Sequence, residues 1–248
     1  RLVVFHAAPL VESVDDRHEH HTSSGDSKIK SLQPILFSKR LGLRAWRKLR
    51  TVLGSLRREI KVSLELATVE NLAQVLQQSD QPMLHFLPSR EYTNGLSMES
   101  YEGELKPLPL AQLRELLDKH APKRPSLVML CARHSQYAGQ IFVEAGVPTV
   151  VCMRGTLPES GISEFVHEFY RVLLTGSPPH EAFAAAQRLQ QEKTPQPDNI
   201  GGFVLLSAPD NGGANSSTTT MTPPDHGELR DLTPKLCPSN LPFFRDDE

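Results

Sequence analysis

The sequence predicts an α/β fold in which helices cover both faces of a mainly parallel sheet. Short apolar, β-branched runs alternate along the chain with longer segments of helical period. Runs such as "VMLC" and "TVVC" lack the polar alternation of half-exposed strands, as expected for strands that are buried on both faces. Glycine and proline separate the two kinds of segment. We therefore expect about six strands, at 1–5, 60–66, 83–87, 127–131, 149–153 and 202–206.

Six helices are predicted between these strands, and several of their ends carry a local signal. Pro109 lies near the first turn of one helix, where proline is favoured. Gly146 and Gly176 each follow a helical segment, as glycines at helix C-termini commonly do. The predicted helices cover residues 39–58, 69–78, 109–120, 136–145, 161–175 and 179–192.

The composition is that of an ordinary soluble domain and points to no special partner. Of the 248 residues, 38% are hydrophobic and 23% are charged, and the formal net charge is −2. No apolar run approaches the ~18 residues that a membrane-spanning helix needs. The three cysteines, Cys131, Cys152 and Cys237, show neither a paired nor a zinc-binding spacing. We expect reduced thiols, a cytoplasmic or nuclear location, and no cofactor, metal or membrane span.

Two stretches carry few structure signals. Residues 11–34 are polar, and we expect a flexible loop there. Residues 209–248 include "DNGGANSSTTTMTPPD", which is too polar to bury a core, so this segment is predicted to be a disordered tail. The globular domain is then 1–208. Because a strand begins at Arg1 itself, we expect the chain to be a piece of a longer protein.

The segment "LVMLCARHS" (127–135) raises the question of a catalytic thiol, because open α/β sheets place their sites at the carboxyl ends of strands. A catalytic cysteine must reach that rim and lie near a base that lowers its pKa. Cys131 continues an apolar run, which favours a core thiol. His85 lies inside another apolar run, which favours a buried neutral imidazole. Ser89 follows that second strand but is not a base at neutral pH.

Two further features have a functional and a plain interpretation. The segment "HEHH" (18–21) has metal-ligand residue types, but it has no distant partner ligands, and a solvated polar stretch is the preferred interpretation. The predicted helix 39–58 has an apolar stripe and a basic face. That face is either solvated or a docking surface for an acidic protein, nucleic acid or anionic surface, with candidate residues Arg44, Arg47, Lys48 and Arg50.

Several segments together resemble one family. "MLHFLPSREYTNGLSME" and "LVMLCARHS" resemble its histidine and cysteine strands. "FVEAGVPTVVCMRG", "FVHEFYRVLLTGSPPHEAFAAAQRL" and "NIGGFVLLSAP" resemble its later strands and helix pair. The family is the CHAT domain, a caspase-like peptidase module that is related to separase and often follows tetratricopeptide repeats. The resemblance covers about residues 1–208 and implies a caspase-like three-layer sandwich.

The resemblance also implies where catalysis would occur. Aligning the family's "LHFAGHG" with "LHFLPSR" places the catalytic histidine at Ser89, and aligning "LSACES" with "LCARHS" places the catalytic cysteine at Arg133. A guanidinium is permanently protonated and cannot act as a nucleophile. No catalytic residue is therefore expected, and we expect a caspase-like scaffold or regulatory module that binds protein partners, including an upstream repeat region.

An alternative remains open: a working cysteine peptidase that uses Cys131 with His85 or His134. Even-numbered steps along a strand keep side chains on one face, so Cys131 and His85 share the faces of the two family positions. The two residues lie at different depths below the rim, Cys131 by about 6.6 Å and His85 by about 13 Å. We therefore expect that the thiol and the imidazole do not meet at the rim.

Overall fold

The computed structural model describes residues 1–14, 31–34, 38–55, 60–78, 80–87, 95–120, 124–193 and 201–207. The chain divides into two units, Arg1–Pro209 and Asp210–Glu248. All of the described residues belong to the first unit, so the predicted tail and most of the predicted loop lie outside them. The domain boundaries therefore stay a prediction.

The first unit is built on one six-stranded sheet with the order β10-β9-β8-β5-β1-β4. All pairs are parallel except β10, which runs antiparallel to β9. This confirms the predicted, mostly parallel sheet of six strands. Its strands are β1 (Leu2–His6), β4 (Val62–Leu66), β5 (Met83–Phe86), β8 (Leu127–Leu130), β9 (Thr149–Gly155) and β10 (Gly201–Ser207).

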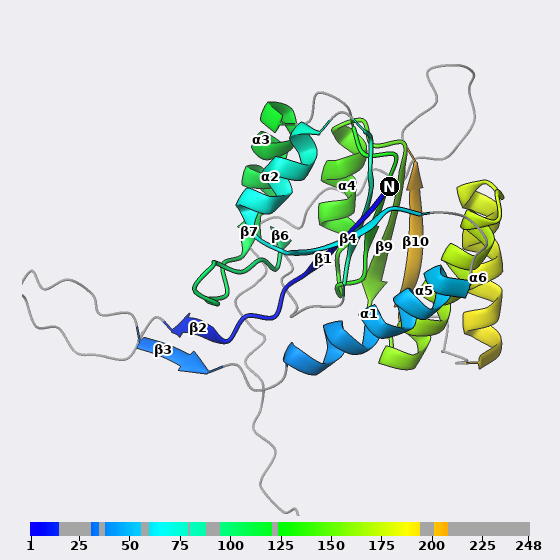
Figure 1. Ribbon diagram of the computed structural model, residues 1–248, viewed down its shortest axis with the longest axis horizontal. Helices are drawn as coiled ribbons and strands as arrows, with labels where there is room; N and C mark the ends of the chain where they lie inside the picture. The colour runs from blue at the N-terminus through cyan, green and yellow to red at the C-terminus, as the bar shows by residue number, and fades with distance from the viewer. Residues whose placement is uncertain are drawn as a thin grey trace, which may run out of the picture. The chain divides into compact units, whose positions relative to one another are not determined.

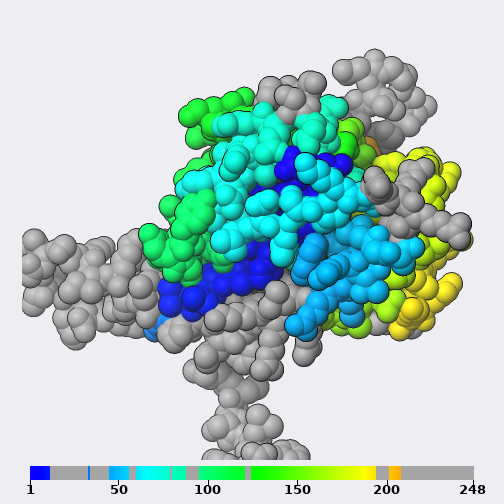
Figure 2. Space-filling view, viewed as in Figure 1, coloured from blue at the N-terminus to red at the C-terminus, as the bar shows by residue number. Residues whose placement is uncertain are grey.

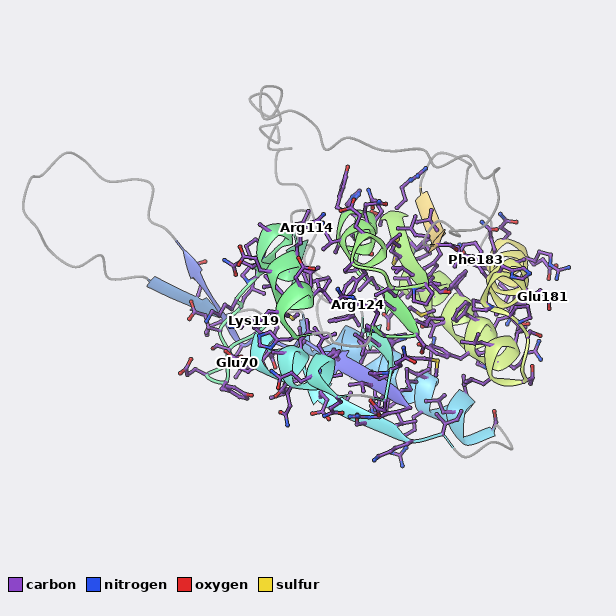
Figure 3. The ribbon with its side chains drawn as sticks, turned by 90° about the horizontal axis from the view of Figure 1, so that it is seen from above. Glu70, Arg114, Lys119, Arg124, Glu181 and Phe183 are labelled. Carbon is purple, nitrogen blue, oxygen red and sulfur yellow. The ribbon has the colours of Figure 1, made fainter. Side chains whose placement is uncertain are left out.

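Helices cover both faces of this sheet, which gives three layers (Figure 1). On one face pack α2 (Val69–Gln77), α3 (Leu110–His120) and α4 (Gln136–Glu144). On the other face pack α1 (Ser38–Ser55), α5 (Glu159–Leu174) and α6 (Pro179–Lys193). Figure 3 shows α2 and α3, which carry Glu70 and Lys119, on the side opposite α6, which carries Glu181 and Phe183.

The apolar runs explain the two cores, because alternate residues of a strand point to opposite faces. In β1, Val3 and Phe5 pack into the core under α2, α3 and α4. Leu2 and Val4 pack into the core under α1, α5 and α6. A strand that contributes to both cores has to be apolar throughout, as its sequence predicts.

The predicted helix ends are also confirmed. Gly146 and Gly176 follow α4 and α5 with φ of 93° and 112°, in the left-handed region that glycine adopts without a steric cost. Pro179 is the first residue of α6. Pro109 lies one residue before α3, in a short strand.

The expectation of a loop over 11–34 is wrong at both ends. Strand β2 (Val11–Val14) pairs antiparallel with β3 (Ser31–Pro34), and only 15–30 lies outside the described residues. Contacts with a distant segment hold this part of the chain: the Leu10 N–H donates to the Gly103 carbonyl, and the Leu105 N–H donates to the Val11 carbonyl. A second small sheet joins β6 (Gly95–Leu96) to β7 (Leu108–Pro109). Local sequence patterns do not reveal such backbone pairings.

Candidate active site

The cysteine that follows β8 belongs to the core. The Cys131 N–H donates to the Phe86 carbonyl at 3.1 Å, which continues the pairing of β8 with β5 beyond Leu130. The Cys131 side chain is 2% exposed. The structure therefore places this thiol as its apolar run predicts, below the rim of the sheet.

The thiol nevertheless contacts a histidine. Cys131 Sγ lies 3.8 Å from His85 Nε2, and His85 Nδ1 lies 2.9 Å from the Tyr170 hydroxyl. The expectation from strand rise was that the thiol and the imidazole do not meet at the rim; the two groups do meet, but in the core. The cause is the register: His85 lies opposite Met129, so Cys131 is only one same-face step further along the neighbouring strand.

The three groups form a buried chain of hydrogen-bonding atoms that can be satisfied in either histidine tautomer. If Nε2 carries the proton, it donates to the sulfur and the Tyr170 hydroxyl donates to Nδ1. If Nδ1 carries the proton, it donates to Tyr170 and the thiol donates to Nε2. Tyr170 comes from α5, so this chain joins one layer of helices to two central strands.

Burial sets the protonation of all three groups. It lowers the pKa of His85 to about 3 and raises the pKa of Cys131 far above its usual range. Burial, and secondly the neighbouring Cys131, also raises the pKa of Tyr170 well above its usual range. At neutral pH the site therefore contains a thiol, a neutral imidazole and a phenol, because desolvation disfavours every charged form. A thiolate nucleophile is absent from this arrangement.

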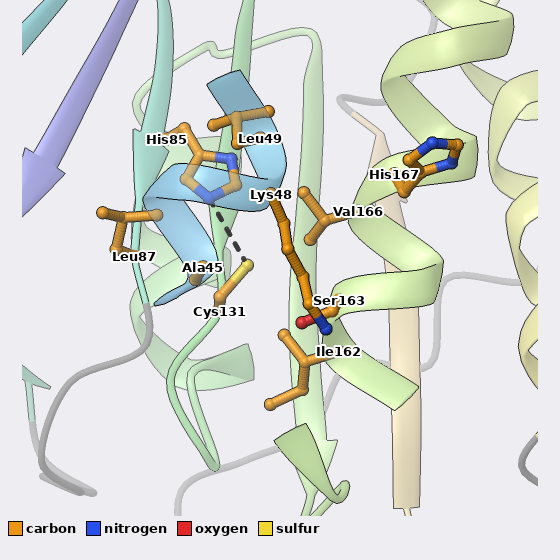
Figure 4. Close-up of a pocket in the computed structure, with 10 residues that line it drawn as sticks. All are labelled: Ala45, Lys48, Leu49, His85, Leu87, Cys131, Ile162, Ser163, Val166 and His167. Carbon is orange, nitrogen blue, oxygen red and sulfur yellow. Dashed lines mark hydrogen bonds between the residues drawn. The ribbon is translucent and has the colours of Figure 1, made fainter. Parts of the chain in front are cut away.

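Side chains of helices α1 and α5 lie beside the pair and line the space next to it (Figure 4). The small cavity beside it leaves about 10 Å³ for the centre of a water molecule, which is about the room for one water. A peptide chain does not fit there. The cavity is lined by Ala45, Lys48, Leu49, His85, Leu87, Cys131, Ile162, Ser163, Val166 and His167.

The turn after Cys131 carries Arg133, which the sequence alignment predicts at the position of the family nucleophile. Arg133 is exposed on this turn, and His134 adopts a left-handed backbone with φ of 53°. Ser135 fixes the turn: its hydroxyl donates to the Leu130 carbonyl at 3.1 Å and accepts from the Met153 N–H at 3.0 Å. The histidine whose ring lies 3.8 Å from Cys131 Sγ is His85, on the neighbouring strand.

Two residues of the site were missed from the sequence. Tyr170 follows Phe169 on a helix with an apolar face. A buried tyrosine needs a partner for its hydroxyl, and this need was the signal that could have identified Tyr170 as part of a buried polar site. No sequence pattern could identify the role of Ser135, because its two backbone partners, Leu130 and Met153, lie on different strands. Ser89, the aligned position of the family histidine, lies outside the described residues.

The other candidate residues are separate from the buried pair. Arg47, Lys48 and Arg50 are exposed on α1, while Leu49 and Val52 of the same helix are buried. The Arg44 side chain and the "HEHH" segment lie outside the described residues. Within the described ranges, no cluster of three His, Cys, Asp or Glu side chains could hold a metal ion. No helix in those ranges is long and apolar enough to cross a membrane.

The family model of the CHAT domain matches residues 41–222 of this chain. The chain therefore belongs to the CHAT domain family, and its three-layer arrangement of a six-stranded sheet and helices is consistent with a caspase-like fold. No curated protein matches the chain.

Solved structures resemble it only weakly. The pyridoxal kinase from Staphylococcus aureus in complex with ADP is 9% identical, with a TM-score of 0.35, and the match covers 84% of this chain and 98% of that one. A putative phosphofructokinase from the same organism is 9% identical, with a TM-score of 0.30, over 84% and 100% of the two chains. At these scores the likeness carries no functional conclusion.

Proposed function

We propose that this CHAT domain does not cleave peptides and acts as a protein-interaction or regulatory module of a larger protein. The observation that supports the proposal most is the state of the Cys131–His85 pair. Both groups are buried and neutral, and side chains of α1 and α5 line the small cavity beside them. A peptidase of this class needs a thiolate that can reach a peptide carbonyl and an imidazole that can exchange protons with it.

The register of the two central strands supports the alignment of the family positions. His85 lies opposite Met129, and Phe86 lies opposite Leu130. Ser89 and Arg133 are separated in the sequence by the same number of residues as those pairs. In the sequence, the two family positions thus keep the spacing of the residues that pair between β5 and β8, as expected of a catalytic pair that follows two neighbouring strands. A hydroxyl and a guanidinium cannot replace imidazole and thiolate there.

A comparison of peptide cleavage by three forms of the chain tests the proposal. The wild type and Cys131→Ala should show the same absence of cleavage on a broad peptide library. Arg133→Cys should place a thiol in the exposed turn, where iodoacetamide labels it in the folded protein. Cleavage by the wild type that Cys131→Ala abolishes would refute the proposal.

The partner that we propose is a protein, which includes any repeat region that precedes Arg1 in a longer parent. Hydrogen exchange of the domain, alone and joined to its preceding region, would map the contact. Protection of a continuous surface on this domain is the expected result. Unchanged exchange over all of its surface would exclude that region as the partner.

A second candidate function is binding of an anionic partner by α1. Arg47, Lys48 and Arg50 are exposed, and none of them has an ion-pair partner among the residues that the structure describes. Arg47 and Lys48 also line an open groove with Glu159 and Ser160. Salt-sensitive retention on heparin that is lost on reversing Arg44, Arg47 and Arg50 would support this function, and unchanged retention would exclude it.

A further inference from the structure

One edge of the sheet is strand β4, whose sequence pattern differs from those of the other five strands. Residues 60–66, "IKVSLEL", alternate strictly between apolar and polar side chains. Within the described part of the chain β4 pairs only with β1, and it ends the strand order. In Figure 1 it crosses the front of the sheet, and its light blue spheres face the viewer in Figure 2.

As far as the described ranges show, the outer side of β4 presents backbone groups without partners. The Lys61 carbonyl accepts from the Leu2 N–H, and the Ala67 N–H donates to the His6 carbonyl, so odd-numbered residues point their backbone groups toward β1. The even-numbered residues must therefore point theirs outward. Among the described residues, nothing bonds to the N–H and C=O groups of Val62 and Leu64. Such an edge is a template for another strand.

The side chains on this edge are more apolar than a protected edge would be. Leu64 is 44% exposed and Leu66 is 46% exposed, and both lie on the face that carries α1. Edge strands that avoid association are short or carry charged side chains, proline, a bulge or an inward-pointing charge. The strand β4 contains no proline. Its charged residue, Glu65, and Lys61, which directly precedes the strand, both lie on the opposite face from the leucines.

We propose that two copies of this chain pair through β4 in antiparallel fashion, about a two-fold axis at Ser63. This register is selected by charge, because it places Lys61 of each copy directly opposite Glu65 of the other. Neither residue has an ion-pair partner in the described ranges. A two-fold axis at Glu65 would instead oppose like charges, which destabilises a strand pair.

The same register completes the backbone bonding and covers the leucines. Val62 of one copy lies opposite Leu64 of the other, and each such pair exchanges two hydrogen bonds. Ile60 lies opposite Leu66. Four apolar side chains from each copy then form one continuous strip beside α1. The six-stranded sheet of each copy becomes half of a continuous sheet, in which the β4 edge of both copies is paired.

Charge exchange in the 248-residue chain tests both the surface and the register. In Lys61→Glu and in Glu65→Lys the cross-strand pairs become like-charged, so each variant should dimerise about tenfold more weakly than the wild type in sedimentation equilibrium. Mixing the two variants should restore dimers, because only the mixed dimer contains two opposite-charge pairs. The proposal is overturned if the wild-type chain stays monomeric across the micromolar range. It is also overturned if the dimer dissociation constant does not change in these variants.

A cysteine pair tests the register independently of affinity. Ser63→Cys should form a symmetric disulfide on mild oxidation, because the two α-carbons would lie about 4.5 Å apart. Glu65→Cys is the matched control, since its two copies would lie about 13 Å apart along the strands. Equal cross-linking of the two variants would overturn the antiparallel register. The proposal does not depend on whether the domain is a peptidase, so the two can fail separately.

Discussion

The sulfur of Cys131 lies 3.8 Å from Nε2 of His85, on a neighbouring strand, while the two side chains are only 2% and 1% exposed. The residue types are those of a cysteine peptidase, but their surroundings are those of a hydrophobic core. Desolvation holds the thiol and the imidazole in their neutral forms. The pair therefore contributes to packing and to the hydrogen bonding of the core, and the following predictions test this role.

Acid should destabilise the domain through His85. Burial lowers its pKa to about 3 in the folded state, while the unfolded state keeps a value near 6.5, so the unfolded state binds more protons in between. The stability from the neutral imidazole is complete above pH 6.5 and is lost as the pH falls toward 3. The free energy of unfolding should decrease by up to about 1.4 kcal/mol per pH unit in this window.

Urea unfolding at a series of pH values measures this slope. The variant His85→Gln should be less stable at pH 7 and should show a flatter slope between pH 6.5 and 4. Burial also lowers the pKa of His6, so part of the slope should survive in that variant. An identical slope in the wild type and the variant would contradict the assignment to His85.

Removing the Tyr170 hydroxyl should destabilise the fold without changing its shape. Tyr170→Phe leaves one side of the buried His85 ring without its partner at 2.9 Å. We expect a loss of about 1–2 kcal/mol in the free energy of unfolding. The matched control is Tyr101→Phe, since the Tyr101 hydroxyl donates to Asn71 on the surface and its loss should cost less than about 0.5 kcal/mol. Equal losses in the two variants would show that the buried bond adds nothing.

Two glycine substitutions should shift stability in opposite directions. Gly146 ends α4 with φ of 93°, so Gly146→Ala should cost about 1 kcal/mol. Gly54 lies in α1, and an added β-carbon there meets no atom within 4 Å, so Gly54→Ala should stabilise by about 0.5–1 kcal/mol. Thermal unfolding of both variants beside the wild type measures the difference. A stabilising Gly146→Ala would contradict the helix end described above.

The elements of the fold could be predicted from the sequence because their signals are local. The apolar run of β8 and the glycine after α4 each identify an element from neighbouring residues alone. The pairing of Val11 with Pro34 could not be predicted, because it depends on backbone bonds to residues 103–105. Composition alone made that segment look like a loop.

The candidate site was predictable in its parts but not in its assembly. The burial of Cys131 and His85 follows from the apolar runs around them. Their contact depends on the register between β5 and β8, and one same-face step decides whether two side chains touch. Tyr170 could be placed on a buried helix face, but its partner is fixed by how α5 lies on the sheet.

The most direct test of a silent thiol–imidazole pair is to map which cysteines of the folded wild-type chain react with a peptide-like electrophile at neutral pH. A Cys237→Ser background removes the thiol that lies outside the described residues. Cys152 is the internal control, since burial raises its pKa to about 12 and it too is buried. We predict that Cys131 reacts no faster than Cys152, and that both react fully only after unfolding. Rapid labelling of Cys131 alone, abolished by His85→Ala, would show a working nucleophile and contradict the account.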